Sequence, residues 1–185
     1  MRVINAHHYL CISRSVQYLK TADFKSETLI REFDESIVSS YPCPESALRW
    51  THAVTCEWLR KIDLAEFTPH LLCAGIPGLL MVCEPTFTAE TLAEILQIPP
   101  HKTLLRRHLT THFNQLIGQR IVAEKRDFLA SGISAQLIPG MRVKIAKKGS
   151  SLSRKKSKTE LILESDDLLC SPVLNSKLLT TLTKW

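Results

Sequence analysis

The histidines at positions 101, 108 and 112 have the spacing that comes nearest to a metal site. His108 and His112 stand four apart, so on a helix both imidazoles face the same way. A zinc site needs at least three ligands, and the stretch between these two histidines lacks the glutamate that makes a zinc-protease motif catalytic. No acidic residue lies between Gln97 and Val122 to complete the site. We therefore expect two half-buried polar histidines and no metal.

Cysteines and glycines are the other residues that could do chemistry. Cys43, Cys73 and Cys83 are candidate nucleophiles, but no fixed spacing pairs any of them with a histidine, and the chain has no C-x-x-C pair. The segment Gly75-Ile-Pro-Gly78 lacks the lysine of a phosphate-binding loop, so close packing and a helix break explain its glycines better. The sequence predicts no enzyme and no cofactor, and a His/Cys metal enzyme is the weakest alternative.

Arg106 and Arg107 stand near the start of the longest periodic segment of the chain. In a helix-turn-helix protein, arginines at this place would contact phosphates or guanines in the major groove. Residues 88–113 would form that motif, but Gln97 stands where its turn usually has glycine, and two prolines lengthen the turn. A DNA-binding transcriptional regulator that uses Arg106 and Arg107 is therefore the alternative function. Two core helices joined by a proline turn are the preferred interpretation.

The positive charge of the chain is concentrated in one segment. The 185 residues have a formal net charge of +6 and a pI of about 9.1. Eight of the 24 lysines and arginines lie between Met141 and Thr159, which contains no acid, so the rest of the chain has fewer bases than its 18 acids. The pI therefore does not favour nucleic acid as the partner of the fold. The part from 147 to 158 is typical of an exposed loop, with an acidic protein or a phosphate as the alternative contact.

Hydrophobic periodicity predicts a mostly α-helical chain. After a short extended start, the expected helices are residues 25–38, 44–62, 69–82, 88–97 and 102–125. Pro77 predicts a kink or two short pieces in the third of these, and Thr88 is expected to cap the fourth. In the helix 44–62, Trp58 lies on the buried stripe and Trp50 falls off it.

Alternating apolar residues replace the helical spacing near the C-terminus. The runs 141–145 and 161–164 are expected to pair as a small hairpin with the basic stretch as its long loop, and Asn175 is expected to cap a last short helix. The predicted fold class is mostly α, a compact multi-helix domain with a small C-terminal β-hairpin-like appendage. The predicted domains are a helical domain at 1–140, a basic hairpin or loop appendage at 141–165, and a tail with a short helix at 166–185.

A cytoplasmic location is expected from the termini and the apolar runs. The N-terminus has His7 and His8 where a signal peptide would have an uninterrupted apolar run. The longest apolar stretch, residues 71–82, is interrupted by glycine and proline and is too short to span a membrane. In a cytosolic protein the cysteines are expected to be reduced and packed as small hydrophobic residues.

Several segments, taken in order, resemble the SctK/OrgA-like family, the cytosolic accessory proteins of type III secretion sorting platforms. Tyr9-Leu10 stands where the family has its opening P-x-x-Tyr-Leu-His segment, and Leu29-Ile-Arg-Glu-Phe33 is similar to the end of its early helix. Leu71–Leu79 resembles the family's central Leu-Leu-x-x-Leu-Gly-x-x-Leu element. Leu129–Leu137 and Arg142–Ile145 resemble its closing helix and strand, so the resemblance spans residues 4–146.

The resemblance implies a non-catalytic adaptor of the sorting platform, located at the cytosolic face of the inner membrane. Its implied partners are other type III secretion components, namely the pod protein and the cytosolic domain of the inner-membrane ring, with no small-molecule substrate. Exposed aromatic side chains are common anchors of interfaces, which makes Trp50 and Trp185 the candidate partner-binding residues.

Overall fold

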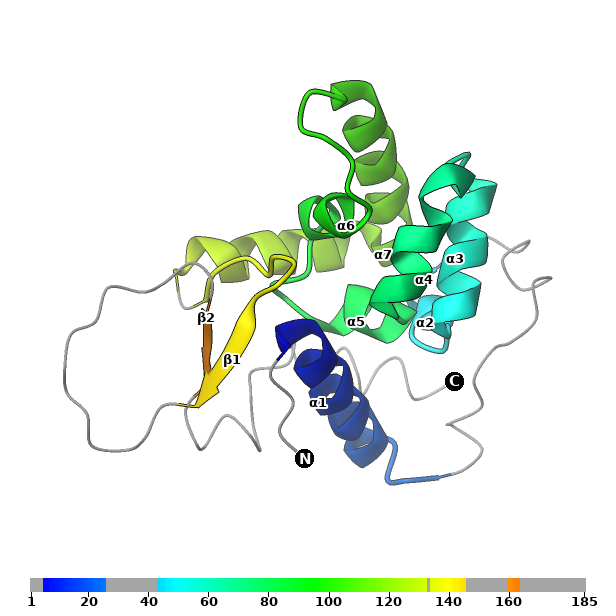
Figure 1. The fold of residues 1–185 in the computed structure, drawn as a ribbon. Coiled ribbons are helices and arrows are strands. Elements are labelled where there is room, and N and C mark those ends of the chain that lie inside the picture. The colour runs from blue at the N-terminus through cyan, green and yellow to red at the C-terminus, as the bar shows by residue number, and fades with distance from the viewer. Residues whose placement is uncertain (1–4, 26–42, 133, 146–159, 164–185) are drawn as a thin grey trace.

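The computed structural model describes residues 5–25, 43–132, 134–145 and 160–163. Within these ranges the prediction of a mostly α-helical fold is confirmed, and Figure 1 shows helices α2 to α6 clustered beside a long, bent α7. The elements are α1 (Ala6–Thr21), α2 (Pro44–Ala47), α3 (His52–Lys61), the 3-10 helix η3 (Ala65–Phe67), α4 (Thr68–Ala74), α5 (Gly78–Cys83), α6 (Ala89–Ile95), α7 (Thr103–Ala130), β1 (Arg142–Ile145) and β2 (Glu160–Leu163). The helix expected at 25–38, apart from its first residue, and the helix expected at Asn175 lie outside the described residues.

One hydrophobic core contains buried side chains from all seven of the described α-helices. Its largest fully buried residues include Trp50, Trp58, Phe87 and Phe113. The rings of Phe87 and Phe113 stack with centroids 6.3 Å apart, which joins the segment before α6 to the middle of α7. Burial of such aromatic side chains dominates core energetics, so these residues are expected to contribute strongly to the stability of the core.

The predicted helix 44–62 is divided into α2 and α3, and the division explains Trp50. Thr51 starts α3 by accepting a hydrogen bond from the Val54 amide through its Oγ1, at 3.4 Å. Trp50 lies in the turn before it, fully buried, and its indole N–H donates to the Ser46 hydroxyl at 3.0 Å. A continuous helix would turn Trp50 away from Trp58, whereas the break turns it into the core. This corrects the prediction that Trp50 faces a partner, while Trp185 lies outside the described residues.

The predicted helix 69–82 is present as two short pieces, α4 and α5, which confirms the expected break. Gly75 ends α4 with φ of +62°, and Pro77 precedes the first residue of α5. The amide of Gly78 donates to the carbonyl of Trp50 at 3.2 Å, so the start of α5 packs against the turn between α2 and α3. Close packing and a helix break account for both glycines, as the sequence indicated.

Helix α7 covers the predicted 102–125 segment and continues to Ala130, but it is bent. Gly118 interrupts it with φ of +79° and ψ of +151°, a backbone conformation that favours glycine. The apolar stripe is buried along both limbs of the bend, as shown by Phe113, Ile117 and Ile121. Figure 1 shows the two limbs pointing in different directions on either side of α6.

The segment expected to be an extended start is the helix α1. Its first turn is capped by the Asn5 side chain, which accepts from the His7 amide at 2.9 Å. Arg14 of α1 is buried and its Nε donates to the Glu84 carboxylate at 2.9 Å. Each of these two side chains is at most 3% exposed. Helix α1 is therefore joined to the core by a charged contact as well as by Ala6 and Leu10.

Glu84, which follows α5, is the centre of a buried polar network. Its carboxylate accepts from the Thr86 amide at 3.1 Å and from the Thr86 hydroxyl at 2.5 Å, in addition to Arg14. The Lys125 ammonium from the second limb of α7 donates to the Glu84 carbonyl and, at 2.9 Å, to the Phe87 carbonyl. Burial lowers the pKa of Lys125 to about 7. The network connects α1, the segment before α6, and α7.

The two alternating runs pair with each other, but the pairing is parallel and not a hairpin. Arg142 lies opposite Glu160, and Ile145 lies opposite Leu163. A hairpin is antiparallel, whereas a parallel pair needs a connection of about a dozen residues or more, and residues 146–159 supply that length. The beginning of β1 also contacts α1, because the Ala6 amide donates to the Met141 carbonyl at 2.9 Å.

Candidate functional site at the start of helix α7

The connection between α6 and α7 is held in one conformation by backbone contacts. Gln97 has φ of +57°, the left-handed conformation that glycine would adopt more easily. The Ile98 amide donates to the Ala93 carbonyl at 3.0 Å, and the Lys102 amide donates to the Pro99 carbonyl at 3.0 Å. The turn between the two helices therefore tolerates Gln97 and is closed by its own hydrogen bonds.

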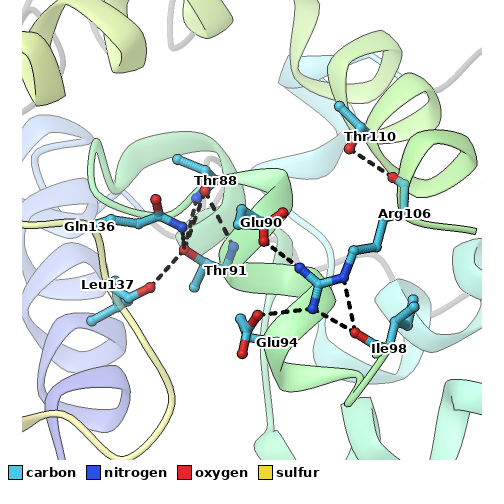
Figure 2. Close-up of polar contacts among 9 residues, drawn as sticks. All are labelled: Thr88, Glu90, Thr91, Glu94, Ile98, Arg106, Thr110, Gln136 and Leu137. Atoms are coloured by element: carbon cyan, nitrogen blue, oxygen red, sulfur yellow. Dashed lines mark hydrogen bonds and ion pairs between the residues drawn. The ribbon is translucent and has the colours of Figure 1, made fainter. Parts of the chain in front are cut away.

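Arg106 fastens this turn to both helices. Its guanidinium binds the Glu90 carboxylate, the Glu94 carboxylate at 2.9 Å, and, through Nε at 3.0 Å, the carbonyl of Ile98 (Figure 2). Glu90 and Glu94 both belong to α6, so one side chain of α7 holds α6 and the turn together. Charge-assisted hydrogen bonds of this kind are stronger than neutral ones. Arg106 thereby fixes the direction in which α7 begins.

The opposite end of α6 is anchored as well. Thr88 accepts from the Thr91 amide at 3.3 Å, and the Thr91 hydroxyl accepts in turn from the Thr88 amide at 3.3 Å. The Thr91 hydroxyl also donates to the Leu137 carbonyl at 2.7 Å, as Figure 2 shows. This capping box confirms the predicted start of the helix at Thr88. Side-chain hydrogen bonds therefore hold both ends of α6, on which α7 begins.

The first turns of α7 and the residue before them expose both apolar and positively charged side chains. Leu104 is 81% exposed, the most exposed of the large hydrophobic residues among those described. Lys102 and Arg107 are also exposed, while the α6 carboxylates Glu90 and Glu94 are bound by Arg106. An exposed leucine accompanied by two exposed cations is a candidate for burial by a partner protein. We refer to Lys102, Leu104 and Arg107 as the α7-start surface.

The sequence singled out Arg106 and Arg107 but missed Leu104 and Lys102. Arg106 is turned toward α6 and is only 13% exposed at its side chain, so it is not displayed as a DNA-reading residue would be. Arg107 is displayed, and it shares its face with Leu104. The signal that could have found Leu104 is its position beside, and not on, the buried stripe of Leu109 and Phe113.

The histidines form no metal centre with other described residues. His108 and His112 are half-buried, as predicted, and their rings meet edge to face with centroids 4.5 Å apart. The Nε2–H of His108 donates to the Ile62 carbonyl at 2.7 Å, which ties α7 to the end of α3. In the part of the chain that the structure describes, no group of three or more His, Cys, Asp or Glu residues could hold a metal ion.

Replacing Arg106 by methionine is expected to lower the free energy of unfolding by about 1–2 kcal/mol, because two carboxylates and a carbonyl lose a charged donor. Urea denaturation followed by circular dichroism measures the change. Arg107→Met removes a neighbouring, exposed arginine and is the matched control, with an expected change within about 0.5 kcal/mol. Equal effects of the two substitutions would contradict the role given to Arg106.

The segment that contains this surface is similar in sequence to known proteins. Residues 47–117 match the SAM domain (Sterile alpha motif) family. Over 177 residues, 96% of this chain, the sequence is 62% identical to a Liprin-beta homolog of Caenorhabditis elegans, of which it covers 18%. It is 45% identical over 128 residues to human Liprin-beta-1, which takes in 69% of the chain and 12% of that protein. Mouse Kazrin is 31% identical over 116 residues, 63% of the chain and 14% of that protein.

These matches show that the resemblance to the SctK/OrgA-like family is wrong. The chain is similar over nearly its whole length to a nematode protein and, over 47–117, to the SAM domain family. The pod protein and the inner-membrane ring are therefore not its partners, and the inner membrane of a secretion system is not its location. The helix-turn-helix alternative is also wrong, because residues 88–113 fall inside the SAM match. Leucine-rich amphipathic helices are alike in many unrelated proteins, which explains the apparent resemblance.

The matched proteins also bear on enzymatic activity. The matched family and the relatives named above include no enzyme family, in agreement with the prediction that this chain is not an enzyme. The chain spans less than a fifth of the length of the curated relatives named above. Among the described residues, no helix is both long enough and apolar enough to cross a membrane.

Proposed function

We propose that this chain is the SAM-domain interaction segment of a liprin-beta-like scaffold protein, and that it binds a partner protein through the α7-start surface. The observation that carries the proposal is the exposure of Leu104 at the start of α7, which the Arg106 contacts join to α6. The identity to the nematode Liprin-beta homolog supports the scaffold role, and the match over 47–117 supports the interaction module.

The chemistry of the surface defines the partner that fits it. Leu104 requires an apolar pocket, since burying a leucine side chain stabilises a complex by about 1.5–3 kcal/mol. Lys102 and Arg107 favour carboxylates around that pocket and repel a basic partner. The partner is therefore a cytoplasmic protein with an apolar pocket in an acidic surface, since the five cysteines among the described residues form no disulfide with one another.

Leu104→Glu is expected to weaken partner binding about tenfold to a hundredfold, because it removes the apolar anchor and places an acid opposite an acidic surface. The wild-type chain and the variant are immobilised, and the proteins retained from a lysate of the source organism are compared by quantitative mass spectrometry. The affinity for the protein lost with Leu104→Glu is then measured by isothermal titration calorimetry with the purified partner.

The matched control is Leu72→Glu, which changes an exposed leucine of α4, on a different surface. Both leucines are exposed, so both variants are expected to keep the free energy of unfolding within about 0.5 kcal/mol of the wild type. A set of retained proteins that is the same for the wild type and for both variants would contradict binding through the α7-start surface.

A further inference from the structure

The bend of α7 forms a groove that the α7-start surface does not include. The groove has a volume of about 370 Å³ and lies between the two limbs of α7 and the beginning of α6. Phe113, Ile117, Val122 and Leu129 give it an apolar lining, and Figure 2 shows three of its other lining residues, Thr88, Glu90 and Thr110. This volume is within the range of roughly 300–1,000 Å³ that is typical of ligand sites.

The bend that forms the groove depends on a glycine. Gly118 has φ of +79°, where a side chain would strain the backbone. A Cβ at this position would meet the nearest atom, Cγ of Pro44, at an ordinary 3.6 Å, so packing alone does not demand glycine there. The backbone conformation of the bend, and with it the groove, is what requires the glycine.

Two of the charged residues that line the groove are engaged elsewhere. The Lys125 ammonium donates to the carbonyls of Glu84 and Phe87, and the Glu90 carboxylate is bound by Arg106. Lys125 is therefore not available to a molecule in the groove, and the negative charge of Glu90 is offset by the Arg106 guanidinium that it binds. The electrostatic character of the rim is therefore decided by the remaining lining charge, Arg126.

Arg126 and Asn114 are the polar groups that can recognise an occupant. The Arg126 side chain is 77% exposed, and its Nε lies 3.6 Å from the carboxylate of its neighbour Asp127. Exposed pairs of this kind contribute little, so the guanidinium can bind a second carboxylate. The half-buried Asn114 carries an amide that both donates and accepts, as a peptide bond does.

We propose that this groove binds a peptide segment of a partner protein that inserts an aliphatic side chain between the limbs of α7 and places a carboxylate at Arg126. The apolar lining takes the side chain, Asn114 takes the peptide group, and Arg126 takes the acid. The positive rim selects an acidic segment over a basic one. This site is separate from the α7-start surface, so the chain has two places at which partner proteins bind.

N-acetyl-L-leucine carries all three groups and is the probe for this site. Its binding to the full chain is followed by two-dimensional ¹H–¹⁵N NMR, with a dissociation constant expected in the millimolar range for a ligand of this size. The expected result is a set of shifts at the amides of Asn114, Ile117, Val122 and Arg126. N-acetyl-L-leucinamide, which lacks the carboxylate, and Arg126→Gln are each expected to weaken binding about threefold to tenfold.

The controls separate this site from the proposed function. Arg120→Gln removes an exposed arginine of the same limb that does not line the groove, and Leu104→Glu changes the α7-start surface; both are expected to leave binding of the probe unchanged. The proposal is overturned by shifts equal to those of N-acetylglycine, by shifts confined to other parts of the chain, by affinity that Arg126→Gln leaves unchanged, or by no shifts at about ten times the expected dissociation constant.

Discussion

Replacing Glu84 by glutamine will lower the free energy of unfolding by about 3–5 kcal/mol, the cost of removing one partner from a buried ion pair. The substitution keeps the size of the side chain and an acceptor for the Thr86 amide, but it removes the charge that faces Arg14. Arg14 would then remain as a buried cation without its carboxylate. Urea denaturation measures the loss, and hydrogen exchange is expected to show reduced protection of the α1 amides.

Two further variants test whether the ion pair causes this effect. In the double variant Arg14→Met/Glu84→Gln the buried cation is absent, so its loss of stability is expected to be smaller than the sum of the two single losses. Arg120→Gln breaks the exposed Arg120–Glu124 pair, whose arginine is 61% exposed, and is expected to change stability by less than about 0.5 kcal/mol. A loss below about 1 kcal/mol for Glu84→Gln would contradict the importance of the network.

The same ion pair explains why α1 could not be recognised from the sequence. The buried side of this helix contains Ala6, His7, Leu10 and Arg14, so two of its four buried positions are polar. In addition, Ile12 is 55% exposed, so a large apolar residue lies on the solvent-facing side of the helix. Helical periodicity assumes that buried positions are apolar, and a tertiary ion pair breaks that assumption. The local signal that was present is Asn5, which caps the helix.

Turns inside long periodic segments also could not be predicted from the sequence. The pattern around residues 44–62 gave the correct stripe at Val54 and Trp58, but Thr51, a capping residue type, divides the segment and brings Trp50 inward. In α7 the apolar spacing continues across Gly118, because both limbs face the same core. The relative direction of the two limbs depends on the backbone conformation of Gly118, and hydrophobic periodicity does not indicate that conformation.

Only part of the candidate site could be predicted from the sequence, for a related reason. Arg106 and Arg107 are adjacent and chemically alike, and the sequence gives them equal weight. Their environments differ because α6 supplies Glu90 and Glu94 to Arg106 alone, over separations of 16 and 12 residues. Long-range partners of this kind decide which charge is displayed and which is structural. Capping at Thr88 and the break at Pro77 were predictable because each depends on residues within a few positions.

Replacing Gly78 by alanine will lower the free energy of unfolding by about 3 kcal/mol or more, because the added methyl group has no space. A Cβ at Gly78 would lie 2.1 Å from the carbonyl oxygen of Ala47 and 3.0 Å from Cβ of Trp50. Both atoms belong to the backbone or are attached to it directly, so a change of side-chain rotamer cannot relieve the clash. The start of α5 must move away from α2, and Trp50 loses packing as it does so.

Gly75→Ala separates this clash from the general cost of losing a glycine. Gly75 is three residues earlier and has φ of +62°, but no atom lies within 4 Å of the position its Cβ would take. Its replacement is expected to lower the free energy of unfolding by about 1 kcal/mol, because alanine is less stable in the left-handed conformation but meets no clash. Thermal and urea denaturation of both variants measure the two losses of stability. The largest loss for Gly78→Ala would be a variant that does not fold at 25 °C. If the two alanine variants were equally stable, α5 would not pack against the α2–α3 turn as closely as the Gly78 contact with Trp50 requires.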